Sequence, residues 1–156
     1  MKKQYTYQEA KEMILAVSEE AEAGKFPSRQ SFMDMLDRNS HIAAQGYNAF
    51  GKIFYWNTAS SHLYGYRESE AVNQDLVDLI LPPEMRRFAR DMIANGRKTG
   101  KMPEACACDL LNSEGEYITV FSGHLVFQWD SATTPEFYCL DLAIESQADE
   151  MITTSL

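Results

Sequence analysis

The chain has little that would tie it to nucleic acid, to a membrane or to an oxidising compartment. Its 156 residues include 14 lysines and arginines against 23 aspartates and glutamates, for a formal net charge of −9. Phosphate backbones and anionic lipids require a basic face, so we expect neither a nucleic-acid partner nor a membrane partner. There is no apolar run of about 18 residues, and the first residues lack a signal-peptide apolar core. We therefore expect a cytoplasmic protein.

Cysteine is also scarce, and its three copies do not indicate a disulfide framework. Cys106 and Cys108 lie two apart on a predicted strand, so they share a face at a spacing too wide for an easy disulfide. A hairpin turn at residues 112–115 would place Cys106 opposite Phe121 and turn His124 to the other face. No ligand cluster forms in that register. We expect no metal site and interpret the cysteines as small buried hydrophobic residues.

The short motifs of common enzyme classes are missing as well. The sequence has no Walker loop, dinucleotide-binding glycine pattern, His-Glu-x-x-His pair or Gly-x-Ser-x-Gly turn. The three histidines, His41, His62 and His124, fall on three separated elements. The carboxylates form no recognisable acid/base pair. We expect no catalytic residues.

Helical periodicity dominates the first 38 residues. Thr6 and Glu9 form a capping-box pattern, and apolar residues then recur at helical spacing until Gly24 ends the helix. Pro27 and Ser28 open a second amphipathic helix. Each helix has one apolar stripe, which requires a partner surface.

From residue 41 the pattern changes to short strands and helices. Strands are predicted at 41–47, 52–56, 104–111, 117–128 and 136–144, and helices at 58–64, 68–72, 75–80 and from Pro83 to Asn95-Gly96. Strands, then helices, then strands indicate an α+β domain and not βαβ units. We divide the chain into an N-terminal helical extension at 1–40, a domain at 41–145 and a polar tail at 146–156.

The most specific pattern lies at residues 51–66. An apolar strand stops at Trp56, Asn57 can cap a short helix, and Gly65 can end that helix in the left-handed conformation. A later hairpin, residues 110–117, has Glu-Gly at its turn. In order and length this domain resembles the PAS domain, or sensory box. The resemblance implies a five-stranded antiparallel sheet with helices on one face, preceded here by the N-terminal amphipathic helices.

The resemblance implies a function in bacterial signal transduction. PAS domains bind a small ligand or a protein partner, and this one would signal in trans without catalysis of its own. Light-sensing flavin relatives carry a reactive cysteine in the helical region, and no cysteine precedes Cys106, so covalent flavin photochemistry is excluded. Haem-binding relatives use a histidine on or near the long helix, and none occurs between Leu63 and Gly123, which argues against haem. The identity of any cofactor stays open.

Six aromatic residues form the candidate ligand cavity between helices and sheet. They are Tyr55, Tyr64, Tyr66, Phe88, Phe121 and Tyr138. Apolar walls with a few tyrosine hydroxyls suit a small, partly aromatic or acidic metabolite. We favour simple core packing of the same residues over a ligand cavity.

Both faces of the predicted sheet are apolar, so both need cover. In strand 52–56, alternation points Ile53 and Tyr55 one way and Phe54 and Trp56 the other. We expect residues 6–38 to cover one face or to build a dimer interface. The residues assigned to this contact are Met13, Ile14, Val17, Phe54 and Trp56. The helices that flank PAS domains often mediate dimerisation, so the resemblance implies a homodimer.

Two other functions compete with the sensory one. A small α+β enzyme with a cone-shaped pocket, of the isomerase or dehydratase type, would need an Asp/His or Asp/Tyr pair inside the cavity. The candidates on strands are His41, His124, Asp109 and Asp141. A dimerisation module with a filled core is the third possibility.

Overall fold

A computed structural model describes residues 3–129 and 134–145. The sheet is five-stranded and antiparallel, with the strand order β2-β1-β5-β4-β3. The elements in chain order are α1 (Tyr7–Glu22), α2 (Arg29–Arg38), β1 (Ala43–Tyr47), β2 (Ile53–Trp56), α3 (Thr58–Tyr64), α4 (Glu68–Ala71), α5 (Leu76–Ile80), α6 (Pro83–Thr99), β3 (Cys106–Leu111), β4 (Tyr117–Phe127) and β5 (Glu136–Ala143). The predicted α+β class, antiparallel sheet and N-terminal helices are confirmed; the predicted tail at 146–156 lies outside the described residues.

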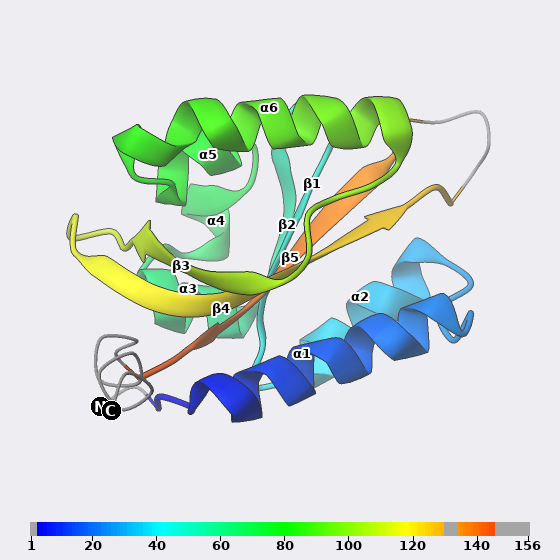
Figure 1. The fold of residues 1–156 in the computed structure, drawn as a ribbon, viewed down its shortest axis with the longest axis horizontal. Coiled ribbons are helices and arrows are strands. Elements are labelled where there is room, and N and C mark those ends of the chain that lie inside the picture. The colour runs from blue at the N-terminus through cyan, green and yellow to red at the C-terminus, as the bar shows by residue number, and fades with distance from the viewer. Residues whose placement is uncertain (1–2, 130–133, 146–156) are drawn as a thin grey trace, which may run out of the picture.

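The sheet separates two hydrophobic cores (Figure 1). Helices α3 to α6 cover one face, where Ile53 and Val120 are fully buried. Helices α1 and α2 cover the other, where Ile14 and Phe32 have no exposed surface. Burying each such side chain stabilises the fold by about 1.5–3 kcal/mol. Within one chain, α1 and α2 therefore cover the face of the sheet opposite α3 to α6.

The alternation predicted for β2 is wrong. Gln45 pairs with Trp56, but Tyr47 pairs with Ile53, so β2 carries one residue more than β1 between these pairs. Such a bulge breaks the two-residue period of a strand. Phe54 and Tyr55 consequently pack on the α1 and α2 side, whereas Ile53 and Trp56 join the other core. Trp56 therefore does not lie under α1.

The predicted helix caps are confirmed. Thr6 and Glu9 form a reciprocal capping box at the start of α1. The Asn57 Oδ1 accepts the N–H of Ser60 at 2.9 Å, and Gly65 ends α3 with a φ of 82°. Asn57 also ties α3 to the sheet, because the same oxygen accepts the N–H of Ala44 and its amide donates to the Ile42 carbonyl. This one side chain fixes where α3 lies on β1.

The predicted end of α6 at Asn95-Gly96 is wrong, because the helix continues to Thr99 and ends at Gly100. A Cβ on Gly96 would lie 2.8 Å from the Phe137 ring, so this glycine permits a close approach to β5. Phe88, which was predicted to line the ligand cavity, is 63% exposed. The buried residues of α6 are Ala89, Ile93 and Gly96.

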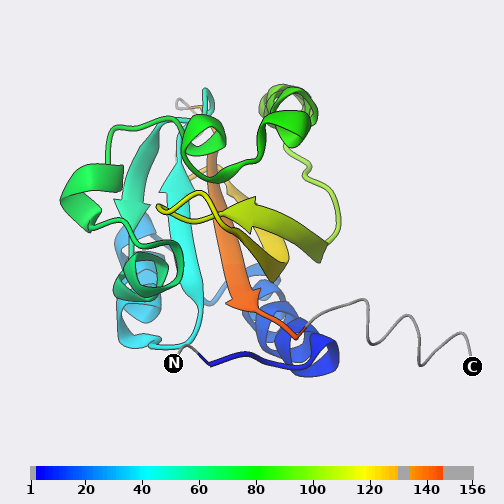
Figure 2. The same ribbon diagram turned by 90° about the vertical axis from the view of Figure 1, so that its left-hand side faces the viewer.

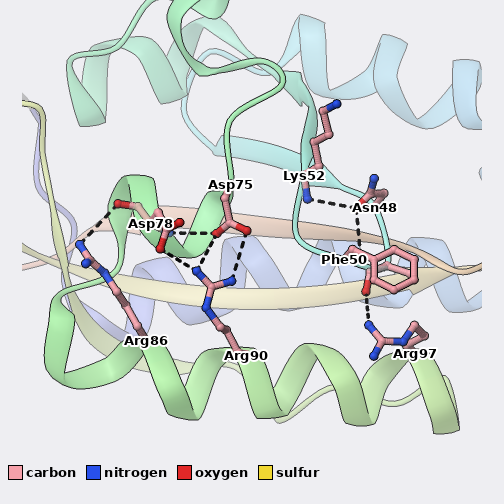
Figure 3. A network of polar contacts seen from close by, with 9 residues as sticks. Asn48, Phe50, Lys52, Asp75, Asp78, Arg86, Arg90 and Arg97 are labelled. Atoms are coloured by element: carbon pink, nitrogen blue, oxygen red, sulfur yellow. Dashed lines mark hydrogen bonds and ion pairs between the residues drawn. The ribbon is translucent and has the colours of Figure 1, made fainter.

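Helix α6 is fastened to its neighbours by arginines along one side (Figure 3). Arg90 contacts Asp75 at 3.2 Å and Asp78 at 2.6 Å. Arg97 donates to the Ala49 carbonyl at 2.7 Å, and its guanidinium lies over the Phe50 ring. Exposed pairs of this kind contribute at most about 1 kcal/mol each, so they orient the helix more than they stabilise it.

Candidate functional site

A cleft of about 640 Å³ opens between α3, the segment before α1 and the ends of β1 and β5. Apolar and polar side chains share its wall. The lining residues are Lys3, Tyr5, Ser40, His41, Ala43, Ala59, His62, Leu63, Asp141 and Ala143. They come from parts of the chain more than 130 residues apart, and the sheet brings those parts together.

The N-terminal segment runs past the end of β5 (Figure 2). Its residues Lys3 and Tyr5 form one wall of the cleft. Tyr5 makes a parallel bridge to Ile144: its N–H donates to the Ala143 carbonyl, and its carbonyl accepts the N–H of Glu145, both at 2.9 Å. The Tyr5 hydroxyl lies 2.9 Å from His41 Nδ1. Tyr5 is 7% exposed, so this wall is a fixed part of the fold.

The floor of the cleft holds a buried carboxyl group. Asp141 has no exposed surface, and its Oδ2 accepts the hydroxyl hydrogen of Tyr64 at 2.6 Å. Burial raises the pKa of Asp141 to about 6, while hydrogen bonding from Ser122, Tyr64 and Gln45 partly offsets that rise. Among the described residues, Asp141 Oδ1 has no partner in hydrogen-bonding geometry, and no ion pair includes this residue.

A second acceptor without a donor lies beside the floor. The Gln45 Nε2 donates to Ser60 Oγ at 2.9 Å, and Ser60 Oγ donates to the Ala44 carbonyl at 2.9 Å. In this arrangement the Gln45 amide presents its nitrogen to Ser60, and its Oε1 points elsewhere. That oxygen is buried, and no described residue donates to it. Buried polar atoms are normally satisfied, so two open acceptors here indicate a place for a donor.

The rim of the cleft is basic. Lys3, His41 and His62 are exposed there, from three different segments of the chain. The Lys3 ammonium lies 4.8 Å above the Tyr5 ring centroid. The cleft therefore combines a carboxyl floor with a rim of potential cations.

The six predicted cavity residues do not line one cavity. Tyr64 and Tyr66 pack in the core under α3 to α6. Tyr55, Phe121 and Tyr138 belong to the opposite core, under α1 and α2. Phe88 is exposed, and none of the six lines the cleft. Of the predicted sheet-cover residues, Met13, Ile14, Val17 and Phe54 lie in the α1 and α2 core, and Trp56 does not.

The predicted hairpin register is wrong by one position. Leu111 pairs with Tyr117, so the loop is one residue longer than predicted, and its backbone is held by Asn112. Cys106 therefore pairs with Ser122, and His124 lies directly opposite Cys139, with 3.3 Å between Nδ1 and Sγ.

This corrected register places His124 and Cys139 on one face, but it does not assemble a metal centre. No group of three or more metal-ligating side chains occurs in the described ranges. Burial lowers the pKa of His124 to about 4, so the ring is neutral near pH 7. Cys139 is buried as expected, whereas Cys106 is exposed.

Sequence reasoning missed most of this site. Asp141 was considered only as an enzyme candidate, and Tyr5, Gln45 and Lys3 were not considered as site residues. The sequence does contain one indication that the Asp141 carboxylate is unusual: it is the only charged residue within the apolar run 137–144. A lone charge in a buried strand is costly and often functional.

Comparison with known families decides the identity of the fold. The family model of the PAS fold matches residues 32–120, which is more than half of the chain. The chain belongs to the PAS family. Among curated proteins, none matches this sequence. Within the described residues, none of the helices of this PAS domain has the length and apolarity needed to cross a membrane.

Solved PAS domains are similar in fold. The PAS domain of Bordetella pertussis BvgS has a TM-score of 0.59 at 13% identity, covering 81% of this chain and 94% of its own. A PAS domain from Desulfitobacterium hafniense scores 0.58 at 18% identity, over 71% and 99% of the two chains. The PAS domain of the Cronobacter turicensis quorum-sensing receptor RpfR, in complex with C12:0, scores 0.55 at 15% identity, over 69% and 97%.

Proposed function

We propose that this PAS domain is a cytoplasmic sensory module that binds a small ligand in the cleft beneath α3 and signals in trans to a partner protein. The observation that carries the proposal is the fully buried Asp141, which lies at the floor of a 640 Å³ cleft with one oxygen lacking a donor. A cleft with a few convergent polar groups is the usual form of a small-molecule site. The RpfR domain, solved with C12:0, is a PAS domain that holds a small molecule.

The signal would leave through the two chain segments that form the cleft wall. Tyr5 and Ile144 are bridged there, and residues 146–156 follow directly. A ligand that contacts this wall would favour one packing of the Tyr5 segment on β5 over another. Such a ligand shifts the equilibrium only by its difference in affinity for the two packings.

We propose that the module has no catalysis of its own. The Asp/Tyr pair required by the enzyme alternative exists as Asp141 and Tyr64, but both side chains are fully buried. Burial beside Asp141 also raises the pKa of Tyr64 well above its usual range, which makes it a poor acid near pH 7. This pair is better suited to structure and binding than to proton transfer.

Native mass spectrometry after incubation with a low-molecular-weight metabolite extract tests the proposal. We expect a mass excess that disappears on denaturation. The variant Ala59→Leu, which places three more carbon atoms in the cleft wall, should lose that excess, and Ala94→Leu on α6 should keep it. Bare protein in all cases would instead favour the filled-core interaction module.

A homodimer stays a prediction. Helices α1 and α2 already cover the second face of the sheet within one chain, so that face needs no second subunit. Leu15, which is 38% exposed on α1, is the apolar residue available for a contact between two copies. Analytical ultracentrifugation of the wild type gives the number of subunits. A dimer that dissociates in the variant Leu15→Glu would place this residue in the contact between the two copies.

A further inference from the structure

The floor of the cleft needs a group that donates several hydrogen bonds. Asp141 Oδ1 and Gln45 Oε1 are both buried acceptors without a described donor. Their residues lie on the adjacent strands β5 and β1 and on the same face of the sheet, since Gln45 pairs with Cys139, two positions before Asp141. An ammonium group has three N–H donors and no acceptor, so it suits an open acceptor such as Asp141 Oδ1.

The charge of the floor favours a cation over a neutral donor. The side chains that act on Asp141 are Tyr64, Ser122 and Gln45, none of which is basic. Tyr47, Cys108 and Cys139 also lie near; burial raises their pKa values, so they stay neutral, and none of these groups can carry a positive charge. Burying a carboxylate without a cationic partner lowers the stability of the fold. A cationic ligand group beside Asp141 would supply the partner that the protein lacks and would offset this loss.

The rim supplies a cation and hydrogen-bond donors. Lys3 brings the positive charge, and the imidazole rings of His41 and His62 can each donate an N–H to an anionic group. Glu9 and Glu12 line a second depression, which shares Lys3 and His41 with the cleft, but neither lines the cleft itself. The cleft therefore runs from a negative floor to a basic rim.

We propose that the cleft binds a small zwitterion, a free α-amino acid or a compound with the same two groups, with its ammonium on Asp141 and its carboxylate at Lys3, His41 and His62. This inference rests on the proposed sensory function and names the ligand class. The ammonium and carboxylate of an α-amino acid are attached to the same carbon atom and would both bind polar groups of the cleft. The side chain of the amino acid would then contact the apolar part of the wall, at Ala43, Ala59 and Leu63.

Isothermal titration with the twenty standard α-amino acids tests the class. For any amino acid that binds, the amine that lacks its carboxylate and the acid that lacks its ammonium serve as matched probes. We expect both probes to bind at least about tenfold more weakly, because each loses a charged hydrogen-bonding group. Equal affinity of the amino acid and either probe would overturn the proposal.

Two variants connect binding to the named residues. Asp141→Asn keeps an acceptor for Tyr64 but removes the charge, and should weaken amino-acid binding at least tenfold; Asp91→Asn, an exposed aspartate on α6, should leave it unchanged. His62→Gln lies on the exposed rim, where folding is not at risk, and should weaken the amino acid but not the amine probe. Unchanged amino-acid affinity in both site variants would overturn the assignment.

The outcome also separates this inference from the proposed function. A metabolite found by native mass spectrometry, combined with no binding of any amino acid, would overturn the zwitterion class and leave the sensory function standing. Bare protein in the metabolite experiment, together with no amino-acid binding, would contradict both.

Discussion

The Tyr64 hydroxyl donates to Asp141 Oδ2 across 2.6 Å, between residues 77 positions apart in the sequence. Both side chains are completely buried. The bond joins the last residue of α3 to β5, two residues before the end of that strand, so it connects the wall of the cleft to its floor. A ligand that occupies the other oxygen of Asp141 would therefore act on α3 as well as on β5.

The first prediction concerns the cost of the buried carboxylate. The pKa of Asp141 is raised in the folded state, so the folded protein holds its proton more tightly than the unfolded chain does. The free energy of unfolding should consequently fall as pH rises from about 4 to about 6 and stay low above that range. Asp141→Asn removes this penalty and should stabilise the ligand-free protein at pH 7 by up to about 3 kcal/mol.

Urea unfolding of the wild type and Asp141→Asn at pH 4 and pH 7 measures this difference. The gain should be present at pH 7 and small at pH 4, where the wild-type carboxyl group is protonated. Asp91→Asn is the control and should show no such pH dependence. A variant that is less stable than the wild type at pH 7 would contradict the account.

The second prediction concerns His124, whose pH dependence has the opposite sign. Its pKa is lowered to about 4 by burial, so the unfolded chain takes up a proton below about pH 6.5 while the folded protein does not. The stability due to the neutral ring is present above pH 6.5 and is lost as pH falls toward 4. His124→Gln should remove a loss of about 3 kcal/mol in the free energy of unfolding between pH 7 and pH 4.

Thermal or urea unfolding across that range checks the effect of His124→Gln. His62→Gln, an exchange at an exposed histidine, is the matched control. The same slope of stability against pH in the wild type and His124→Gln would show that the ring is not held neutral.

The third prediction concerns the close approach of α6 to β5. Gly96→Ala would place a Cβ 2.8 Å from both the Phe137 ring and Met102 Sδ. Alanine favours a helix over glycine by about 1 kcal/mol, but overpacking against a buried ring costs about 1–3 kcal/mol. We expect Gly96→Ala to lower the free energy of unfolding, measured with urea, by about 1 kcal/mol. Asn95→Ala, at the exposed neighbouring position, should be neutral or slightly stabilising.

The fourth prediction separates sheet cover from dimerisation on α1. Ile14 is fully buried against the sheet, and its Cγ2 would lie 2.5 Å from a Cβ on Gly123, whereas its neighbour Leu15 is 38% exposed. Ile14→Ala should lower the free energy of unfolding by about 2–5 kcal/mol at any protein concentration. If the protein is a monomer, Leu15→Ala should lower the free energy of unfolding by less than about 0.5 kcal/mol.

Urea unfolding at several protein concentrations distinguishes the two roles. A truncated chain that begins at His41 should lose cooperative unfolding, because it exposes the core that Ile14 and Phe32 fill. If that truncated chain were soluble and equally stable, α1 and α2 would not be the required cover.

Local chemistry explains which features could be predicted from the sequence. The capping boxes, Asn57 and Gly65 act over three or four neighbouring residues, so their patterns are visible without the fold. The register between two strands, in contrast, shifts when a loop or a bulge contains one residue more or one residue fewer. The extra residue in β2 and the longer loop at Asn112 each moved side chains to the opposite face, and both predictions failed for that reason.

The cleft could not be predicted because its residues come from both ends of the chain. Tyr5 reaches the site only through its bridge to Ile144, and Asp141 only through the pairing of β5 with β1. No periodicity in the sequence encodes those contacts. The aromatic residues, in contrast, pack into two filled cores on the two sides of the sheet, as simple core packing predicts, except for the exposed Phe88.

The central claim is that a small ligand binds beneath α3, and a chemical-shift map tests it most directly. The ¹⁵N-labelled protein would be titrated with a low-molecular-weight metabolite extract and then with the amino acid that binds most tightly. The account predicts saturable shifts at the amides of Tyr5, His41, Ala59, His62 and Asp141, with little change at α6. Shifts confined to another surface, or no saturable shifts at all, would contradict it.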